Sequence, residues 1–188
     1  MIFDAVELAH LVVVTLALGF IFMSYLPRAQ PRSPYGQSYG GFDRESFKLA
    51  IMVTAPAVIL HELGHKFAAL FLGLTATFKA WWFGLFLGVV LKLFNSPLII
   101  LAPGYVEIGG NVTPFASFIT AFSGPFINLL LWFVAWLVLE RKTHMTQRSA
   151  IVWHLTKQVN MFLFIFNMIP IPPLDGSKVF AALWTMLF

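Results

Sequence analysis

The feature that most constrains this chain is its series of long apolar runs, which contain almost no charge. Hydrophobic residues make up 59% of the 188 residues and charged residues 11%, whereas a soluble domain of average composition has about 25% charged residues. A helix that crosses a bilayer needs roughly 20 apolar residues, and several runs approach or exceed that length. The sequence therefore predicts an all-α, multi-pass membrane protein in the cell membrane.

About five to six transmembrane helices are expected. The clearest helical runs are about 5–26, 47–74, 114–139, 149–168 and 177–188. The first run begins with Asp4 and Glu7, not with the basic residues of a cleavable signal, so we expect a retained anchor helix. The polar segment 27–46 is rich in Pro, Gly and Ser and is expected to be an irregular loop.

Residues 75–113 do not form a simple apolar helix. They contain an apolar run of about ten residues, too short to span upright, and are broken by Pro103 and by Gly109 and Gly110. Irregular backbone at membrane depth is tolerated only when it is buried in protein or lines a wet cavity. We therefore expect a small re-entrant, β-containing segment near 75–110, with strands over 75–83 and 98–108. A full spanning helix over 81–101 is the alternative.

Composition also excludes some classes of function. The chain has no cysteine, which excludes disulfides, thiolate metal sites and cysteine nucleophiles. The net charge of +4 is typical of basic loops beside anionic headgroups. Because no basic cluster is interleaved with aromatic residues, we expect no nucleic-acid partner.

Three of the eight acids lie inside apolar surroundings: Glu62, Glu107 and Asp175. An ionisable group at membrane depth is costly and by default indicates a functional site. Glu107 lies beside two glycines, and we expect it to cap nearby loop amides rather than to act as a second catalytic acid.

Glu62 belongs to the sequence His61-Glu62-Leu-Gly-His65, an HExxH motif. Residues i and i+4 share one face of a helix, so both imidazoles could bind one zinc ion, and Glu62 could act as a general base without being a ligand. The alternative is a polar helix face on which the two histidines hydrogen-bond to neighbours.

Asp175 follows a break in the last apolar runs made by Pro170, Pro172 and Pro173. A catalytic zinc has three protein ligands and one open position, and a lone acid beside a helix break is suited to be the third ligand. The alternative is that Asp175 only caps the N-terminus of the final helix.

Together these motifs resemble the site-2 protease family of intramembrane zinc metalloproteases, in its compact form without PDZ-like or CBS-like domains. The resemblance covers about residues 47–180 and is carried by HExxH, by Gly124-Pro125-Phe-Ile-Asn128, and by Asn167-x-x-Pro-x-x-Pro-Leu-Asp175-Gly. Gly104-Tyr-Val is similar to the end of the family's re-entrant β-loop. The apolar, aromatic-rich insertion at about 78–101 departs from the family pattern.

The resemblance implies a single membrane-embedded metalloprotease domain over 1–188, with one Zn²⁺ per chain held by His61, His65 and Asp175. It implies that Glu62 is catalytic and that Asn167 and Asn128 contact the substrate backbone or the oxyanion. The expected substrates are membrane proteins, cut in or near a transmembrane segment within the lipid bilayer.

The family pattern also places the active site within the bilayer, nearer the cytosolic face. The basic loops, 28–48 and 141–148, would favour the opposite orientation under the positive-inside rule. A zinc-binding membrane protein without hydrolysis, such as a transporter or chaperone-like protein, is the alternative function. The sequence leaves the oligomeric state and the identity of the substrate open.

Overall fold

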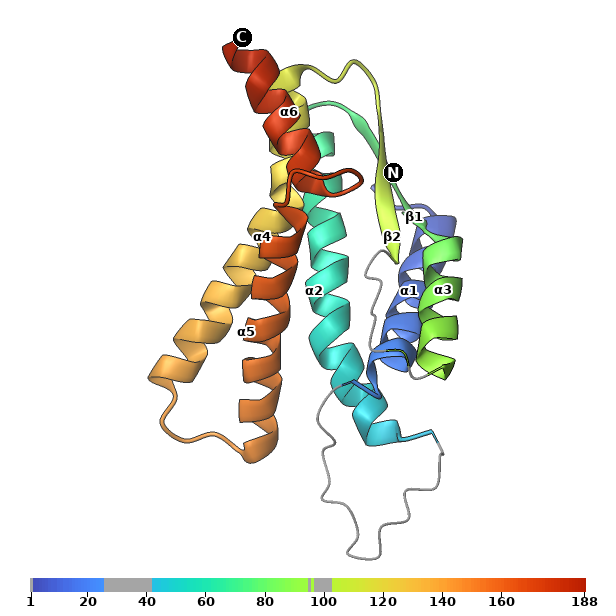
Figure 1. The fold of residues 1–188 in the computed structure, drawn as a ribbon, viewed down its shortest axis with the longest axis vertical. Coiled ribbons are helices and arrows are strands. Elements are labelled where there is room, and N and C mark those ends of the chain that lie inside the picture. The colour runs from blue at the N-terminus through green and yellow to red at the C-terminus, as the bar shows by residue number, and fades with distance from the viewer. Residues whose placement is uncertain (1, 26–41, 95, 97–102) are drawn as a thin grey trace, which may run out of the picture.

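The computed structural model describes residues 2–25, 42–94, 96 and 103–188. These residues form a mostly helical molecule with one small sheet (Figure 1). The elements in chain order are α1 (Ala5–Phe22), α2 (Arg44–Phe71), β1 (Thr75–Ala80), α3 (Trp82–Leu93), β2 (Gly104–Gly109), α4 (Pro114–Arg141), α5 (Gln147–Asn167) and α6 (Asp175–Leu187).

The ends of the long helices follow from local sequence. Each of the four is preceded by a side-chain oxygen that accepts a backbone N–H of the first turn, supplied by Asp4, Asp43, Thr113 and Thr146. Such caps satisfy N–H groups that have no partner within the helix. The helices expected at 47–74, 114–139 and 149–168 are therefore present, with ends shifted by a few residues.

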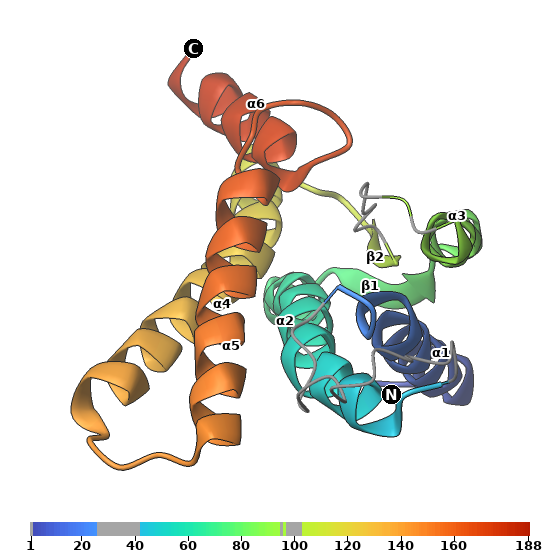
Figure 2. The ribbon, with the colours of Figure 1, turned by 60° about the horizontal axis from the view of Figure 1, so that its bottom comes forward.

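Helix α2 lies at the centre of the molecule. Helices α4 and α5 pack on one side of it, while α1, α3 and the two strands lie on the other (Figures 1 and 2). Helix α6 packs against α4 near the end of the molecule that carries the C-terminus. Helix α2 thus contacts α1, α4, α5 and both strands.

Three of the described helices are long and apolar enough to cross a membrane: α1, α2 and α4. Helix α5 has 21 residues but includes Arg148 and Lys157, while α3 and α6 have only 12 and 13 residues. The expected mostly helical fold is confirmed. Among the described helices, fewer meet both the length and the hydropathy criterion than the five to six transmembrane helices expected from the sequence.

The expected β-containing segment is present between α2 and α4. Strands β1 and β2 pair antiparallel, with Thr75 opposite Gly109 and Ala80 opposite Gly104. Strand β1 is shorter than the predicted 75–83, while β2 covers 104–109 and residues 98–102 of the second predicted strand lie outside the described residues. Between the strands, α3 ends at Leu93, so the described part of 81–101 contains a short helix of twelve residues, which cannot span a bilayer upright.

Two acids have partners that sequence reasoning did not foresee. Glu107 pairs with Lys79 across the two strands instead of capping loop amides, because the antiparallel register brings the two side chains together. Glu7 is 4% exposed and forms a buried ion pair of 2.5 Å with Lys66 of α2, and its carboxylate also accepts the backbone N–H of Phe78. This pair joins α1, α2 and β1 at one point.

Candidate metal centre and catalytic site

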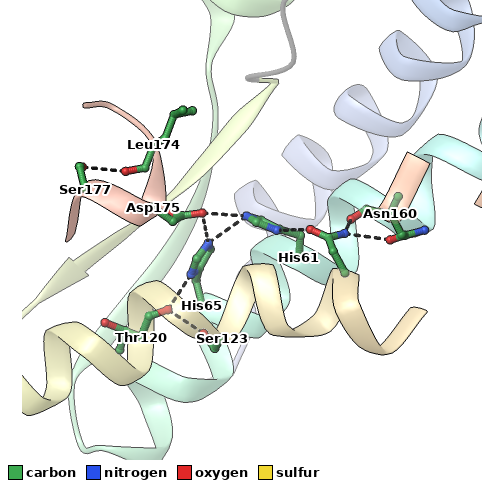
Figure 3. A network of polar contacts seen from close by, with 10 residues as sticks. His61, His65, Thr120, Ser123, Asn160, Leu174, Asp175 and Ser177 are labelled. Carbon is green, nitrogen blue, oxygen red and sulfur yellow. Dashed lines mark hydrogen bonds and ion pairs between the residues drawn. The ribbon is translucent and has the colours of Figure 1, made fainter. Parts of the chain in front are cut away.

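The HExxH motif lies in the second half of α2. His61 and His65 stand one turn apart on the face that contacts α4, each 7% exposed, and their Nε2 atoms are 3.1 Å apart (Figure 3). Both rings therefore present the same nitrogen to one point. The expected sharing of one helix face follows directly from the i, i+4 spacing.

The chain returns to this point after α5. Helix α5 ends at Asn167, and the proline-rich turn that follows brings Asp175 to the start of α6. The close approach of α6 to the end of α5 requires a glycine, because a Cβ at Gly176 would lie 2.5 Å from the backbone of Met168. The capping position of α6 is occupied by Leu174, and Asp175 points at the histidines instead of capping the helix (Figure 3).

The three side chains fit a zinc ion by their geometry. Asp175 Oδ2 lies 3.1 Å from His61 Nε2 and 3.3 Å from His65 Nε2. A tetrahedral zinc with bonds of about 2.0–2.1 Å separates its ligand atoms by ~3.3 Å. The three observed separations are therefore those of three corners of one tetrahedron, with the fourth corner left for water or substrate. Within the described residues, no other group of three such side chains meets in this way.

The outer nitrogen of each ring is held by α4. His61 Nδ1 donates to Asn128 Oδ1 at 2.6 Å, and His65 Nδ1 donates to the Thr120 carbonyl at 2.7 Å. Both acceptors are oxygens without a proton to give, so Nδ1 carries the hydrogen in each ring. That tautomer leaves the Nε2 lone pair free for a metal, as is typical of zinc-binding histidines.

Gly124 makes the close contact between α4 and these rings possible. A Cβ at this position would lie 2.3 Å from His65 Nε2 and 2.8 Å from His61 Nε2. On the other side of the contact, a Cβ at Gly64 would lie 2.9 Å from the Ser123 carbonyl. The two glycines of the motifs therefore face each other's helices, and α4 can approach only because both lack side chains.

A cavity of about 700 Å³ opens beside the three ligands. Glu62, the general base expected from the sequence, is 8% exposed and lines this cavity next to His61. The cavity is bounded by α2, β2, α4, α5 and α6, and its polar lining residues include His61, Glu62, His65, Tyr105, Ser117, Thr120, Asn167, Asp175 and Lys178. The site thus has room for an extended peptide beside the metal ligands.

The two asparagines expected to contact substrate have different positions. Asn167 lines the cavity at the end of α5. Asn128 is fully buried, and its amide is used by His61 on one side and by the Ala57 carbonyl and Asn160 on the other. In the structure the hydrogen-bonding groups of Asn128 are directed at protein, so it lies behind His61 and does not line the cavity.

Sequence reasoning missed two contributors to the site. Thr120 acts through its carbonyl, which no side-chain motif could indicate. Asn160 lies in the middle of α5, just after a polar stretch that includes Thr156 and Lys157, and nothing in the sequence distinguishes it from those polar neighbours.

Comparison with known proteins shows the family to which the chain belongs. The family model described as peptidase family M50 matches residues 138–188, which include the end of α5 and Asp175. A protein of Methanocaldococcus jannaschii named "Putative zinc metalloprotease" is 33% identical over 181 residues, covering 94% of this chain and 84% of that protein. The chain belongs to peptidase family M50.

In two other relatives, the matched region covers less of the relative's own length. A protein of Synechocystis with the same descriptive name is 28% identical over 87% of this chain, which spans 38% of that protein. A Bacillus subtilis protein, again named "Putative zinc metalloprotease", is 35% identical over 72 residues. No solved structure matches the chain.

Proposed function

We propose that this chain cleaves peptide bonds in or near the transmembrane segments of membrane proteins, using one zinc ion held by His61, His65 and Asp175. The observation that carries the proposal is the spacing of the three ligand atoms, 3.1, 3.1 and 3.3 Å, beside a cavity that also contains Glu62. As a member of peptidase family M50 related to a protein named as a zinc metalloprotease, the chain is an intramembrane zinc metalloprotease. The individual site residues and the count of one zinc per chain are part of the proposal.

Glu62 has the role of general base. It follows His61 by one residue, or about 100° around the helix axis, so it lies beside the ligands without being one. When bound, zinc supplies a Lewis acid that activates water and polarises the substrate carbonyl. Glu62 accepts the proton of the attacking water and delivers it to the leaving nitrogen. Because the carboxylate is almost fully buried, it faces the cavity and little bulk solvent.

Asn167 is proposed to hold the substrate. It lies at the last residue of α5 and lines the cavity near Asp175. Its amide can donate to a substrate carbonyl, either in the ground state or as negative charge develops on the oxygen. Asn128 is assigned to the orientation of His61 instead.

The substrate is proposed to bind as an extra strand at β2. A peptide bond in a helix is shielded by its own hydrogen bonds, so the substrate must be extended before attack. In the described part of the sheet β2 pairs only with β1, and residues 104–106 and 108 of β2 line the cavity. The edge of β1 is already occupied at Phe78, whose N–H donates to Glu7. An added strand can therefore pair with β2, where backbone bonds supply affinity without sequence specificity.

Proline substitutions test this mode of binding. Backbone N–H groups of a strand alternate between its two edges, so one of Tyr105→Pro and Val106→Pro removes a donor that faces the cavity. We expect that variant to lose turnover while it keeps its zinc. Unchanged turnover in both variants would exclude strand addition at β2.

The metal centre is proposed to lie within the bilayer. His61 lies roughly 25 Å along α2 from Arg44 and roughly 15 Å from Phe71. If α2 crosses the bilayer, His61 is therefore well separated from both membrane surfaces. We propose that α5 also crosses, because it packs along α4, and that the count of five to six is reached only when α3 and α6 are included as partly inserted helices. The catalytic core is assigned to about 47–180 within a single domain.

We follow the family pattern in placing the metal centre nearer the cytosolic face. The chain has no native cysteine, so a single cysteine at Thr143, in the turn between α4 and α5, can be labelled with an impermeant thiol reagent in sealed vesicles. Labelling from the outside is expected. Labelling only from the cytosolic side would reverse the orientation and agree with the positive-inside rule.

Cleavage by purified protein tests the function itself. Wild type and Glu62→Gln would be compared on a panel of single-span membrane peptides in detergent, with zinc measured in both. Cleavage by wild type and none by a zinc-loaded Glu62→Gln protein is expected. If both proteins hold zinc and cleave the panel equally, Glu62 is not the base. If wild type holds zinc and cleaves no member, the non-hydrolytic zinc protein becomes the better account.

A further inference from the structure

Asn160 is a fully buried polar residue in helix α5, with 0% of its surface exposed. It lies two turns before Asn167, away from the cavity. A buried amide is costly unless its groups are hydrogen-bonded, and this one is bonded at both ends. Its Oδ1 accepts from Asn128 Nδ2 at 2.9 Å, and its Nδ2 donates to the Thr156 carbonyl at 2.8 Å.

These bonds continue without a break to the metal centre (Figure 3). Asn128 Nδ2 donates to Asn160 and also to the Ala57 carbonyl at 2.9 Å, and Asn128 Oδ1 accepts from His61 Nδ1 at 2.6 Å. The chain of contacts therefore runs from α5 through α4 to α2, and it ends on the imidazole whose opposite nitrogen is 3.1 Å from Asp175.

The direction of every bond in this chain is fixed by its two backbone ends. A carbonyl can only accept, so the Thr156 carbonyl sets Nδ2 of Asn160 toward it and turns Oδ1 toward Asn128. In the same way, the Ala57 carbonyl and Asn160 Oδ1 together occupy both hydrogens of Asn128 Nδ2. Only Oδ1 of Asn128 can then face His61, and only Nδ1–H of His61 satisfies it.

Reversing the Asn128 amide would disrupt the metal centre. The reversed amide would present N–H groups to His61 Nδ1, which would have to become an acceptor. The ring hydrogen would then move to Nε2, where it blocks metal binding. Without Asn160, one hydrogen of Asn128 Nδ2 would be buried without a partner, which removes part of the penalty for reversal.

We propose that Asn160 is a positioning residue that fixes the orientation of Asn128 and, through it, the zinc-binding tautomer of His61. The inference rests on the proposed function, since it assumes that His61 is a zinc ligand. It also gives α5 a second task, because the same helix delivers Asp175 through the turn that follows Asn167. Helix α5 thus leads into the turn that carries the third ligand and also orients the first ligand.

The test is zinc affinity, measured by chelator competition on the full chain in detergent. Loss of a group that hydrogen-bonds to a metal ligand lowers metal affinity by roughly 10–100-fold. We therefore expect Asn128→Ala to lower zinc affinity within that range, and Asn160→Leu to lower it by about 10-fold. Asn160→Asp keeps an acceptor for Asn128 in either protonation state, and in its neutral form it also donates to Thr156. It is therefore expected to restore affinity to within about threefold of wild type.

Two comparisons separate positioning from general loss of packing. Val159→Ala weakens apolar packing of α5 next to Asn160 without touching the hydrogen-bonded chain, and is expected to lower the unfolding temperature but leave zinc affinity unchanged. In an Asn128→Ala background, Asn160→Leu is expected to lower zinc affinity no further, because its effect passes through Asn128.

Several results would overturn the inference alone. These are unchanged zinc affinity in Asn160→Leu, equal losses in Asn160→Leu and Asn160→Asp, or full additivity with Asn128→Ala. If Asn160→Leu does not fold, Asn160→Asp decides, because a tenfold loss in that variant contradicts the proposed acceptor role. If wild type itself binds no zinc, the proposed function fails first.

Discussion

Replacing Gly124 with alanine tests whether α4 shapes the metal centre. The added Cβ would lie 2.3 Å from His65 Nε2, whereas ordinary contacts begin at 3.4 Å, so the ring or the helix must move by about 1.1 Å. The His65 ring cannot swing aside without losing its 2.7 Å hydrogen bond to the Thr120 carbonyl. Thr120 lies on α4, the helix that also carries Gly124. Zinc sites tolerate departures of only about 0.2 Å in ligand distance.

We therefore expect Gly124→Ala to weaken zinc binding at least as much as the loss of a group that hydrogen-bonds to a zinc ligand, which is roughly 10–100-fold. Helix propensity works in the opposite direction, because alanine favours a helix over glycine by about 1 kcal/mol. Any loss must then come from the contact with the histidines and not from a weaker α4.

The assay is zinc affinity by chelator competition, with unfolding temperature measured on the zinc-free protein. Gly88→Ala in α3 is the matched control, because its Cβ would meet only the flexible end of Ile21, and it is expected to bind zinc like wild type. If Gly124→Ala binds zinc as tightly as Gly88→Ala, the close contact between α4 and the ligands is not a feature of the folded protein.

Three further predictions concern charge. Asp175→Asn keeps the size of the third ligand but removes its charge, so zinc content after dialysis should fall well below that of wild type; retention at the wild-type level would exclude Asp175 as a ligand. Lys66→Met leaves the Glu7 carboxylate buried without its partner and should lower the free energy of unfolding, measured with denaturant, by about 3–5 kcal/mol. Adding Glu7→Gln should recover part of that loss. If it recovers nothing, the broken ion pair is not the cause of the lost stability. Lys79→Ala removes an ion pair with Glu107 that is open to solvent, and should leave the unfolding temperature unchanged; a fall of several degrees would contradict this.

The parts of the site that sequence predicted were those with short-range patterns. His61 and His65 lie one helical turn apart, so their meeting needs only that the segment be helical. Asp175 was assigned from a proline break beside a lone acid, and the structure brings it to the same point through the turn after α5.

The parts that sequence could not predict depend on contacts between distant segments. Asn160 and Asn128 are 32 residues apart, and Glu7 and Lys66 are 59 residues apart. No periodicity links either pair, because each depends on how whole helices pack. Glu7 lies near the N-terminus, where an acid is expected to be solvated, and only the packing of α1 against α2 and β1 shows that it is buried.

In the fold, too, features set by nearby residues were predicted and those set by distant contacts were not. Helix ends were close to those expected, because caps such as Asp4 and Thr113 act within one turn. The segment between α2 and α4 was harder to predict, since a twelve-residue apolar helix and two six-residue strands are too short to give a clear periodic pattern. Their identity depends on the pairing of β1 with β2 across α3, which is a tertiary contact.

The most direct test of the central claim is the zinc content and zinc coordination of purified wild-type protein, by elemental analysis with X-ray absorption. The account predicts about one zinc per chain, bound by two histidine nitrogens and by oxygen at about 2.0–2.2 Å, and lost when His61 or His65 is replaced by alanine. Absence of zinc at about one per chain, or zinc that survives both replacements, would contradict it.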